Sequence, residues 1–285
     1  MNSLDGKVAL ISGAARGIGA TTARLMVEAG ARVAIGDVLD ERGRQTAQGI
    51  AGQSETAIYQ HLDVTREEAW SSAIAATVAR FGGLDILVNN AGLFLGKGIE
   101  EARLDEWHRL CAVNLTGVFL GTKHALPALR ERARQSPHGS AIVNLASVAG
   151  LVGSQLDPLY SMTKGGVTLF TKSTALEFAR KGYRVRVNSI HPGLIQTDMG
   201  EQTFISRACN LGSNDVEAVR QQAMSRHPIG RLGVPEDIAK GIVFSRLRRC
   251  RLYDRRRARD RRRLDCTIST AAMVKAVRHP AAGWR

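Results

Sequence analysis

Three side chains able to exchange a proton or stabilise a charge lie within a short stretch of this sequence. Tyr160 and Lys164 are four residues apart in the run YSMTK, so on a helix both would project from one face. Ser147 lies 13 residues upstream, just after an apolar run typical of a strand. A phenol, with an ordinary pKa of about 10, is too weak a base near neutral pH, and a neighbouring ammonium group would lower that pKa. The same spacing also suits an ordinary amphipathic helix, so the pair alone is weak evidence.

Short apolar runs alternate with longer helix-like stretches, the pattern of a parallel sheet covered by helices on both faces. The expected strands are 8–11, 33–35, 58–62, 86–88, 141–145 and 185–190. The expected helices are 17–29, 41–50, 67–81, 104–130, 160–180 and 235–244. We therefore predict one α/β domain over residues 1–245, a Rossmann-like doubly wound parallel sheet with ligands at the carboxyl ends of its strands.

A glycine-rich loop, SGAARGIG from Ser12 to Gly19, joins the first expected strand to the first expected helix. Glycines let the backbone turn sharply and approach a pyrophosphate, and the helix N-terminus supplies N–H groups and partial positive charge. Asp37 ends the second expected strand, 18 residues after Gly19, where a carboxylate can bind both ribose hydroxyls and repel a 2′-phosphate. A glycine turn used only for packing is the alternative. The acidic residue favours a dinucleotide and predicts NAD as the cofactor.

Arg16 favours NADP instead, because a guanidinium in this loop could bind the 2′-phosphate of that cofactor. A carboxylate at the ribose would have to be desolvated or displaced to admit a phosphate, whereas an arginine on a loop can turn into solvent. We therefore favour NAD over NADP.

These segments resemble, in order and spacing, the classical short-chain dehydrogenase/reductase family. The resemblance covers residues 6 to about 244 and rests on SGAARGIG, Asp37, Asp63, NNAG at 89–92, Asn114, Ser147, Tyr160, Lys164, HPG at 191–193 and Thr197. The runs GDVLDERG, YQHLDVT and RVNSIHPG are most similar to bacterial NAD-dependent hydroxysteroid and alicyclic alcohol dehydrogenases. The resemblance implies an oxidoreductase that transfers a hydride between a nicotinamide cofactor and a secondary alcohol or ketone.

The resemblance also implies a role for each catalytic residue. Tyr160 would be the acid/base, helped by the charge of the oxidised nicotinamide, and Ser147 would hydrogen-bond the substrate oxygen. Lys164 would also bind the nicotinamide ribose, and Asn114 would hold a water that connects the lysine to solvent. For Asn114, an asparagine inside a helix that bonds the backbone is the alternative.

The expected cofactor contacts lie at the strand ends and in the segments that follow them. They are Gly13, Arg16, Gly17, Ile18, Gly19, Asp37, Asp63, Val64, Asn90, Ala91, Gly92, Tyr160, Lys164, Pro192, Gly193, Ile195 and Thr197. By resemblance, Thr197 would bond the carboxamide of the nicotinamide.

Residues 194–226 are expected to form a lid over the substrate. The expected substrate contacts are Ser147, Gln155, Tyr160, Leu194 and Met199. Apolar residues of the lid, Phe204 among them, predict a largely apolar pocket for a bulky, steroid-like or alicyclic, secondary alcohol. Packing of these residues in the core is the alternative.

The positive charge of the chain is concentrated at its C-terminal end. Residues 246–285 carry +11 of the net charge of +14, and 11 arginines stand between 246 and 263. Such a block cannot form the buried last strand of the family, because desolvating an unpaired guanidinium is too costly. Codons can be assigned to residues 248–267 so that reading one base later gives DDAAYMTGAELVIDGGLTA, which has the family's last strand and turn. We interpret residues 246–285 as an anomalous tail from a shifted reading frame that replaces this strand.

Composition excludes several classes of protein. With 44% hydrophobic and 23% charged residues and no apolar run near the roughly 20 residues of a membrane span, we expect neither disorder nor a membrane protein. The first ten residues lack a secretory signal and the four cysteines lack C-x-x-C spacing, so we expect a cytoplasmic protein without a metal site. The family resemblance implies a homo-oligomer, a tetramer or a dimer.

Three other functions remain open at this point. An NADPH-dependent 3-oxoacyl thioester reductase of the same family is supported by Arg16 and opposed by Asp37. The basic tail could bind nucleic acid, although the nearly neutral remainder of the chain leads us to expect no such partner. A cofactor sensor or scaffold is disfavoured by the intact set Asn114, Ser147, Tyr160 and Lys164.

Overall fold

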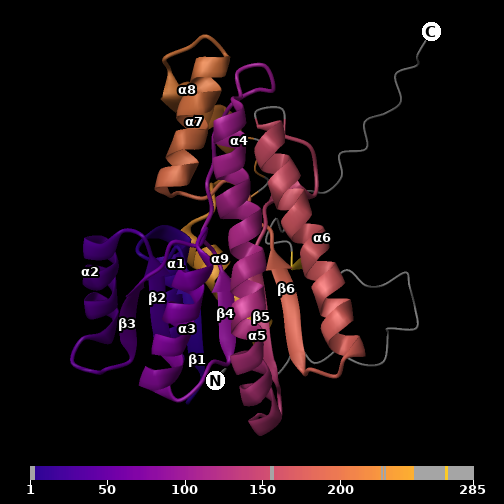
Figure 1. Cartoon of the computed structure of the whole chain (residues 1–285). Helices are drawn as coiled ribbons and strands as arrows, with labels where there is room; N and C mark the ends of the chain where they lie inside the picture. The colour runs from indigo at the N-terminus through magenta and orange to yellow at the C-terminus, as the bar shows by residue number, and fades with distance from the viewer. Residues whose placement is uncertain (1–3, 155–156, 226, 228, 247–266, 269–285) are drawn as a thin grey trace.

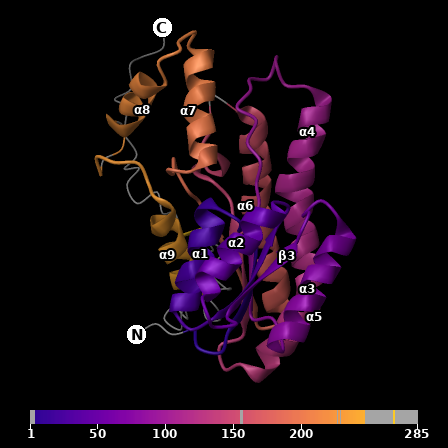
Figure 2. The ribbon, with the colours of Figure 1, turned by 90° about the vertical axis from the view of Figure 1, so that its left-hand side faces the viewer.

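In the computed structural model of this chain, a seven-stranded parallel β-sheet lies between two layers of helices (Figures 1 and 2). The structure describes residues 4–154, 157–225, 227, 229–246 and 267–268. The strand order is β3-β2-β1-β4-β5-β6-β7. The chain runs outward from β1 to β3 and then returns to β4 beside β1, so the order reverses between β1 and β4. Ligands of such sheets bind at this point of reversal. The predicted α/β class and doubly wound sheet are confirmed.

The elements follow the predicted alternation closely. The strands are β1 (Val8–Ser12), β2 (Arg32–Asp37), β3 (Ala57–His61), β4 (Ile86–Asn89), β5 (Ser140–Leu145), β6 (Val185–Ile190) and β7 (Thr267–Ile268). The helices are α1 (Gly17–Glu28), α2 (Asp40–Ala51), α3 (Glu67–Phe81), α4 (Leu104–Cys111), α5 (Gly117–Gln135), α6 (Pro158–Arg180), α7 (Asp198–Asn210), α8 (Val216–Ser225) and α9 (Pro235–Arg246). A π-helical turn η1 (Ala112–Thr116) joins α4 to α5, so the single helix predicted over 104–130 has three parts. A short 3-10 helix, η2 (Val148–Gly150), follows β5.

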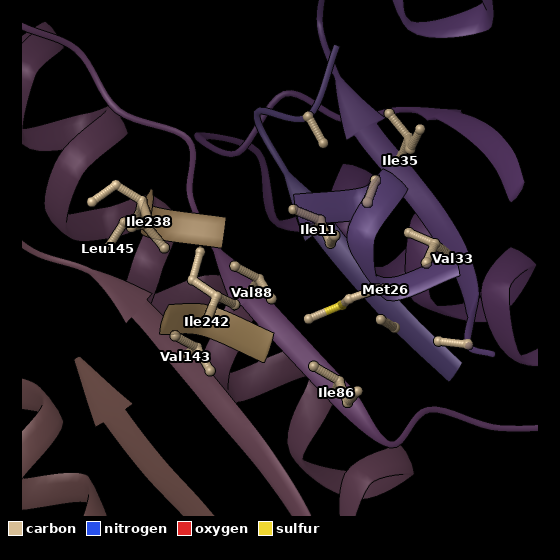
Figure 3. Packing of buried hydrophobic residues seen from close by; sticks show 14 of the residues in the cluster. Ile11, Met26, Val33, Ile35, Ile86, Val88, Val143, Leu145, Ile238 and Ile242 are labelled. Atoms are coloured by element: carbon tan, nitrogen blue, oxygen red, sulfur yellow. The ribbon is translucent and has the colours of Figure 1, made fainter. Parts of the chain in front are cut away.

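The sheet is buried on both faces, which explains why its strands are continuous apolar runs. In β1, Leu10 and Ile11 point to opposite faces, and neither is exposed to solvent. On one face, the strands pack against Met26 of α1 and against Ile238 and Ile242 of α9 (Figure 3). On the other face they pack against α3, α5 and α6 through Trp70, Leu129 and Phe178. Burying each large apolar side chain contributes roughly 1.5–3 kcal/mol, so both layers hold the strand ends in place.

The sheet's last strand comes from the C-terminal tail. Thr267 and Ile268 form β7 and pair with Ser189 and Ile190 of β6. The arginine-rich segment 246–263 lies outside the described residues except for Arg246, the last residue of α9. The interpretation of 246–285 as the product of a shifted reading frame therefore stays a prediction.

Candidate active site

A deep cleft of about 1920 Å³ opens at the carboxyl ends of the strands. This volume exceeds the roughly 300–1,000 Å³ of a site for one drug-sized molecule, so it has room for a dinucleotide and a substrate. Nearly all of the predicted cofactor residues line it: Gly13, Arg16, Gly17, Ile18, Asp37, Asp63, Val64, Asn90, Ala91, Gly92, Tyr160, Lys164, Pro192, Gly193, Ile195 and Thr197. The predicted substrate residues Ser147, Leu194 and Met199 line it too. Gln155 lies outside the described residues.

The glycine loop between β1 and α1 is packed so closely that side chains larger than those of Gly13 and Gly19 would not fit. Gly13 has φ +64°, and a Cβ there would lie 2.6 Å from Cα of Ala91. A Cβ on Gly19 would lie 2.4 Å from the carbonyl oxygen of Gly13. Gly19 thus packs beneath the loop and supports it, and its predicted contact with the cofactor stays a prediction. The Asn90 amide donates to the carbonyl oxygens of Ser12 (3.0 Å) and Gly13 (2.7 Å), which ties this loop to the end of β4.

Asp37 is held at the mouth of the cleft by the backbone. One carboxylate oxygen accepts from the N–H of Ala15 at 2.9 Å, and the other accepts from the N–H of Leu39 at 3.1 Å. The side chain is buried, but the residue still lines the cleft, so its remaining lone pairs can meet hydroxyl groups of a ligand. Arg16 turns to the other wall, where its guanidinium forms an ion pair with Asp198 at the start of α7.

Ser147, Tyr160 and Lys164 meet at the ends of β5 and α6. Ser147 caps η2, because its hydroxyl accepts from the N–H of Ala149 at 3.1 Å, and the same hydroxyl lowers the pKa of the Tyr160 phenol. The Lys164 ammonium lies 5.5 Å from the centre of the tyrosine ring and donates to the carbonyl oxygen of Leu145 at 2.8 Å. The structure therefore brings together the three side chains that the sequence singled out.

Burial dominates the ionisation of this group. It raises the pKa of Tyr160 to about 12, with a further rise from the charge of Asp157 and an opposing effect of the Ser147 hydrogen bond. Burial also lowers the pKa of Lys164 to about 8. Desolvation of the phenol is the largest of these effects on Tyr160, and the expected lowering of its pKa by Lys164 stays a prediction. The positive charge of an oxidised nicotinamide would lower the pKa of Tyr160.

Asn114 lies in η1 and is fully buried. Its side-chain oxygen accepts from the N–H of Leu93 at 2.7 Å, and its amide donates to the carbonyl oxygen of Leu93 (2.9 Å) and to the hydroxyl of Thr163 (3.1 Å). The side chain therefore ties the segment after NNAG to α6, which is the alternative considered for this residue. It does not line the cleft.

The predicted lid corresponds to α7 and α8, which stand beyond the edge of the sheet (Figure 1, orange). Thr197 caps α7, because its hydroxyl accepts from the N–H of Gly200 at 3.2 Å. Phe204 does not line the cleft: it is 1% exposed and packs with Val219 of α8 in a small core inside the lid. Packing, the alternative for these apolar residues, is the better description of Phe204.

The family model described as short chain dehydrogenase matches residues 7–207 of the chain. The chain belongs to the short-chain dehydrogenases. Its similarity to relatives is substantial: it is 45% identical over 199 residues to trans-4-hydroxycyclohexanecarboxylate dehydrogenase of Sinomonas cyclohexanicum, covering 68% of this chain and 74% of the relative. It is 46% identical over 212 residues to 3-alpha-(or 20-beta)-hydroxysteroid dehydrogenase of Mycobacterium bovis, covering 72% and 78%.

Among solved structures, this short-chain dehydrogenase is similar to 3-ketoacyl-(acyl-carrier-protein) reductase from Brucella melitensis complexed with NADH. The TM-score is 0.77 at 30% identity, with 87% of this chain and 93% of the other covered. These findings confirm the predicted family and its likeness to hydroxysteroid and alicyclic alcohol dehydrogenases. The chain is thus an oxidoreductase of a family that uses a nicotinamide cofactor. No helix among the described residues is both long and apolar enough to cross a membrane.

Two residues of this dehydrogenase's site escaped the sequence analysis. Phe94 lines the cleft and meets the Tyr160 ring edge-on, with ring centres 5.4 Å apart. Asp157 caps α6 three residues before that tyrosine. An acidic residue directly before Pro158 is a recognised signal for a helix start and could have revealed Asp157, whereas nothing local marked Phe94.

Proposed function

We propose that this short-chain dehydrogenase transfers a hydride between NAD(H) and a bulky or cyclic secondary alcohol or ketone, with Tyr160 as acid/base. The observation that carries this proposal is the gathering of Ser147, Tyr160 and Lys164 in one wall of a cleft large enough for a dinucleotide. A cytoplasmic location is part of this proposal.

The glycine loop supports binding of a dinucleotide. The space that a Cβ on Gly13 would fill lets the backbone approach a pyrophosphate, whose charge suits the N-terminus of α1. The Asp37 carboxylate, fixed by the N–H groups of Ala15 and Leu39, would accept hydrogen bonds from both adenosine ribose hydroxyls. It would also repel a 2′-phosphate, while the Asp198 carboxylate holds the Arg16 guanidinium at the other wall. These charges favour NAD over NADP.

The catalytic roles follow from which atoms reach the substrate. When bound, the nicotinamide accepts or donates the hydride. The Tyr160 phenolate would take up the hydroxyl proton of an alcohol, and in the reverse direction the Tyr160 phenol would return it to a ketone. The Ser147 hydroxyl donates to the substrate oxygen and stabilises its developing negative charge. The Lys164 ammonium would bind the nicotinamide ribose hydroxyls and stabilise the phenolate.

The substrate side of the cleft supports an apolar ring system. Phe94, Val152, Leu194 and Met199 line it together with the Ser147 and Tyr160 hydroxyls. Two relatives in the same family are named for a hydroxycyclohexanecarboxylate and for hydroxysteroids. An alicyclic or steroid-like secondary alcohol combines a flat apolar body with one hydroxyl, which suits such a surface.

An exposed apolar stripe on α6 supports the proposed homo-oligomer. Met162, Leu169 and Leu176 recur every seven residues and are 57%, 66% and 48% exposed. Side chains at this spacing share one helix face, and a row of exposed apolar groups is a typical subunit interface. Sedimentation velocity should therefore show a dimer or tetramer, and a monomer at micromolar concentration would contradict this part of the proposal.

The test of the proposed reaction is a panel of secondary alcohols and ketones with NAD(H) and NADP(H), followed by the absorbance of the reduced nicotinamide. The panel contains cyclohexanol, cyclopentanol, a 3α-hydroxysteroid and a 3-oxoacyl thioester. We expect turnover of a cyclic alcohol with NAD, and a preference for the thioester with NADPH would favour the reductase alternative.

Tyr160→Phe should lower kcat by about 100-fold or more while NAD binding, measured by calorimetry, changes little. Tyr183→Phe is the matched control, because Tyr183 packs against Phe178 rather than lining the cleft. Near-normal turnover by Tyr160→Phe would overturn the acid/base assignment.

A further inference from the structure

Asp157 is a buried carboxylate beside the catalytic tyrosine. It is 1% exposed and stands at the N-cap of α6. One carboxylate oxygen accepts from the N–H of Tyr160 at 2.8 Å. The other accepts from the N–H groups of Gly96 at 2.8 Å and Leu95 at 3.3 Å. One side chain therefore joins the first turn of α6 to a segment about sixty residues earlier in the chain.

The segment that Asp157 holds forms a wall of the cleft. Phe94 directly precedes the two bonded residues and packs edge-on against the Tyr160 ring, at an interplanar angle of 82°. Gly96 has φ +70°, and a Cβ there would lie 2.2 Å from the hydroxyl oxygen of Ser206 on the lid helix α7. The wall, the lid and the tyrosine thus meet around the residues that Asp157 binds.

We propose that Asp157 is a positioning residue for the reaction, which holds Tyr160, the Phe94 wall and the Gly96–lid contact in one arrangement. This inference rests on the proposed function, in which Tyr160 carries the proton. A neutral asparagine or serine can cap a helix, but three converging N–H groups need an acceptor with two free oxygens. Hydrogen bonds to a charged carboxylate are also about twice as strong as neutral ones, which suits a contact that must not loosen during turnover.

The charge of Asp157 has a second effect, on the proton of Tyr160. The groups that face the phenol are Asp157 and Lys164 on α6 and the neutral Ser147 after β5, and beyond Ser147 lies His191, whose pKa burial lowers. Of the two charged side chains, only the carboxylate opposes loss of the phenolic proton. Asp157 therefore adds to the effect of burial, which raises the pKa of Tyr160 most, in favouring the protonated phenol.

The test is Asp157→Asn, which keeps an oxygen for the Tyr160 N–H but loses the charge and the second acceptor. Tyrosinate formation is followed by ultraviolet absorbance immediately after pH jumps, before alkaline unfolding. Subtracting the same titration of Tyr160→Phe isolates this phenol from the other three tyrosines of the chain. A unit charge at roughly 10 Å, at an effective dielectric constant of about 20, changes an ionisation by about one pH unit. We expect the Tyr160 midpoint to move toward acid by about that amount.

Activity gives the second measurement, with the secondary alcohol that the wild-type chain oxidises fastest. We expect kcat to fall about tenfold and its pH profile to move toward acid, with KM for NAD unchanged, because the wall beside Tyr160 is loosened while the cofactor loop is untouched. Asp215→Asn is the matched control, since Asp215 accepts from the Ala218 N–H at 2.8 Å in the same way at the start of α8. It should leave the Tyr160 titration unchanged.

A purely structural cap gives a different result. If Asp157→Asn only lowers the unfolding temperature, while the Tyr160 titration and the pH profile of kcat match the wild type, the proposal is wrong. If that variant does not fold, Asp157→Ser, which keeps a capping oxygen, is measured in the same way and decides by the same criteria. The titration needs no substrate, so it distinguishes failure of this inference from failure of the proposed reaction.

Discussion

Replacement of Gly19 by alanine tests whether the glycine loop is shaped by packing from below. A Cβ at this position would lie 2.4 Å from the Gly13 carbonyl oxygen, 2.7 Å from Cα of Ala14 and 2.7 Å from the Asn90 amide nitrogen. Two of these three atoms belong to the backbone, so they cannot turn aside as the end of a side chain would. To remove this clash, the loop must move until the distance between the new Cβ and the Gly13 carbonyl oxygen reaches about 3.0 Å. That movement strains the 2.7 Å hydrogen bond between Asn90 and Gly13.

Overpacking of this kind costs roughly 1–3 kcal/mol. We expect Gly19→Ala to lower the unfolding temperature by several degrees and to weaken NAD binding by about tenfold or more, because the displaced backbone is the surface that would meet the pyrophosphate. Differential scanning calorimetry and isothermal titration with NAD measure the two effects. Gly49→Ala is the matched control, because Gly49 lies within α2 and a Cβ there would have nothing within 4 Å. The free energy of unfolding of this variant should rise by up to about 1 kcal/mol, since alanine favours a helix more than glycine does. If Gly19→Ala has the NAD affinity and the unfolding temperature of the wild type, the glycine loop is not shaped by packing from below.

Three further perturbations test the site. Asp37→Ala should raise the dissociation constant of NAD about tenfold or more and relax discrimination against NADP; unchanged preference in a cofactor titration would contradict the assigned role. Because burial lowers the folded-state pKa of Lys164 from 10.5 to about 8, the folded chain binds fewer protons between these values. Urea unfolding should then show that the free energy of unfolding of the wild type rises by about 3 kcal/mol from pH 8 to 10.5 relative to that of Lys164→Met. If the two free energies change with pH in parallel, the lowered pKa of Lys164 is wrong. Asn114→Ala leaves the part-buried N–H and C=O of Leu93 without their side-chain partner. Thermal unfolding should therefore show a loss of roughly 2–4 kcal/mol, and a loss below 1 kcal/mol would argue against this tie between Asn114 and Leu93.

The sheet could be predicted from the sequence because strands that are buried on both faces are continuous apolar runs. Leu10 and Ile11 point to opposite helical layers, so both must be apolar, and the other central strands repeat this pattern. Asp37 and Ser147 could be placed because each directly follows or ends such a run. The helix predicted over 104–130 hid the π-turn that contains Asn114, since one extra residue per turn leaves composition and amphipathicity almost unchanged.

The parts that escaped prediction depend on partners distant in the chain. Backbone bonding was only the alternative for Asn114, and the role of Asp157 was not predicted, because their partners Leu93 and Gly96 are 21 and 61 residues away in the chain. Phe204 was expected in the pocket but lies inside the lid, because apolar spacing on a helix does not reveal which neighbour covers it. The raised pKa of Tyr160 follows from how deeply the fold buries the phenol, a quantity that residue spacing does not contain.

The position of α9 has a consequence for how the chain is made. Ile238 and Ile242 fill the same apolar layer as Met26, so the nucleotide-binding half of the sheet is covered by residues from near the opposite end of the chain. While a ribosome is still synthesising the middle of the protein, that half is covered on this face only by α1 and α2, and the part of its surface that Ile238 and Ile242 later cover faces water. The packing of this layer is therefore completed only after α9 has emerged from the ribosome, late in the synthesis of the chain.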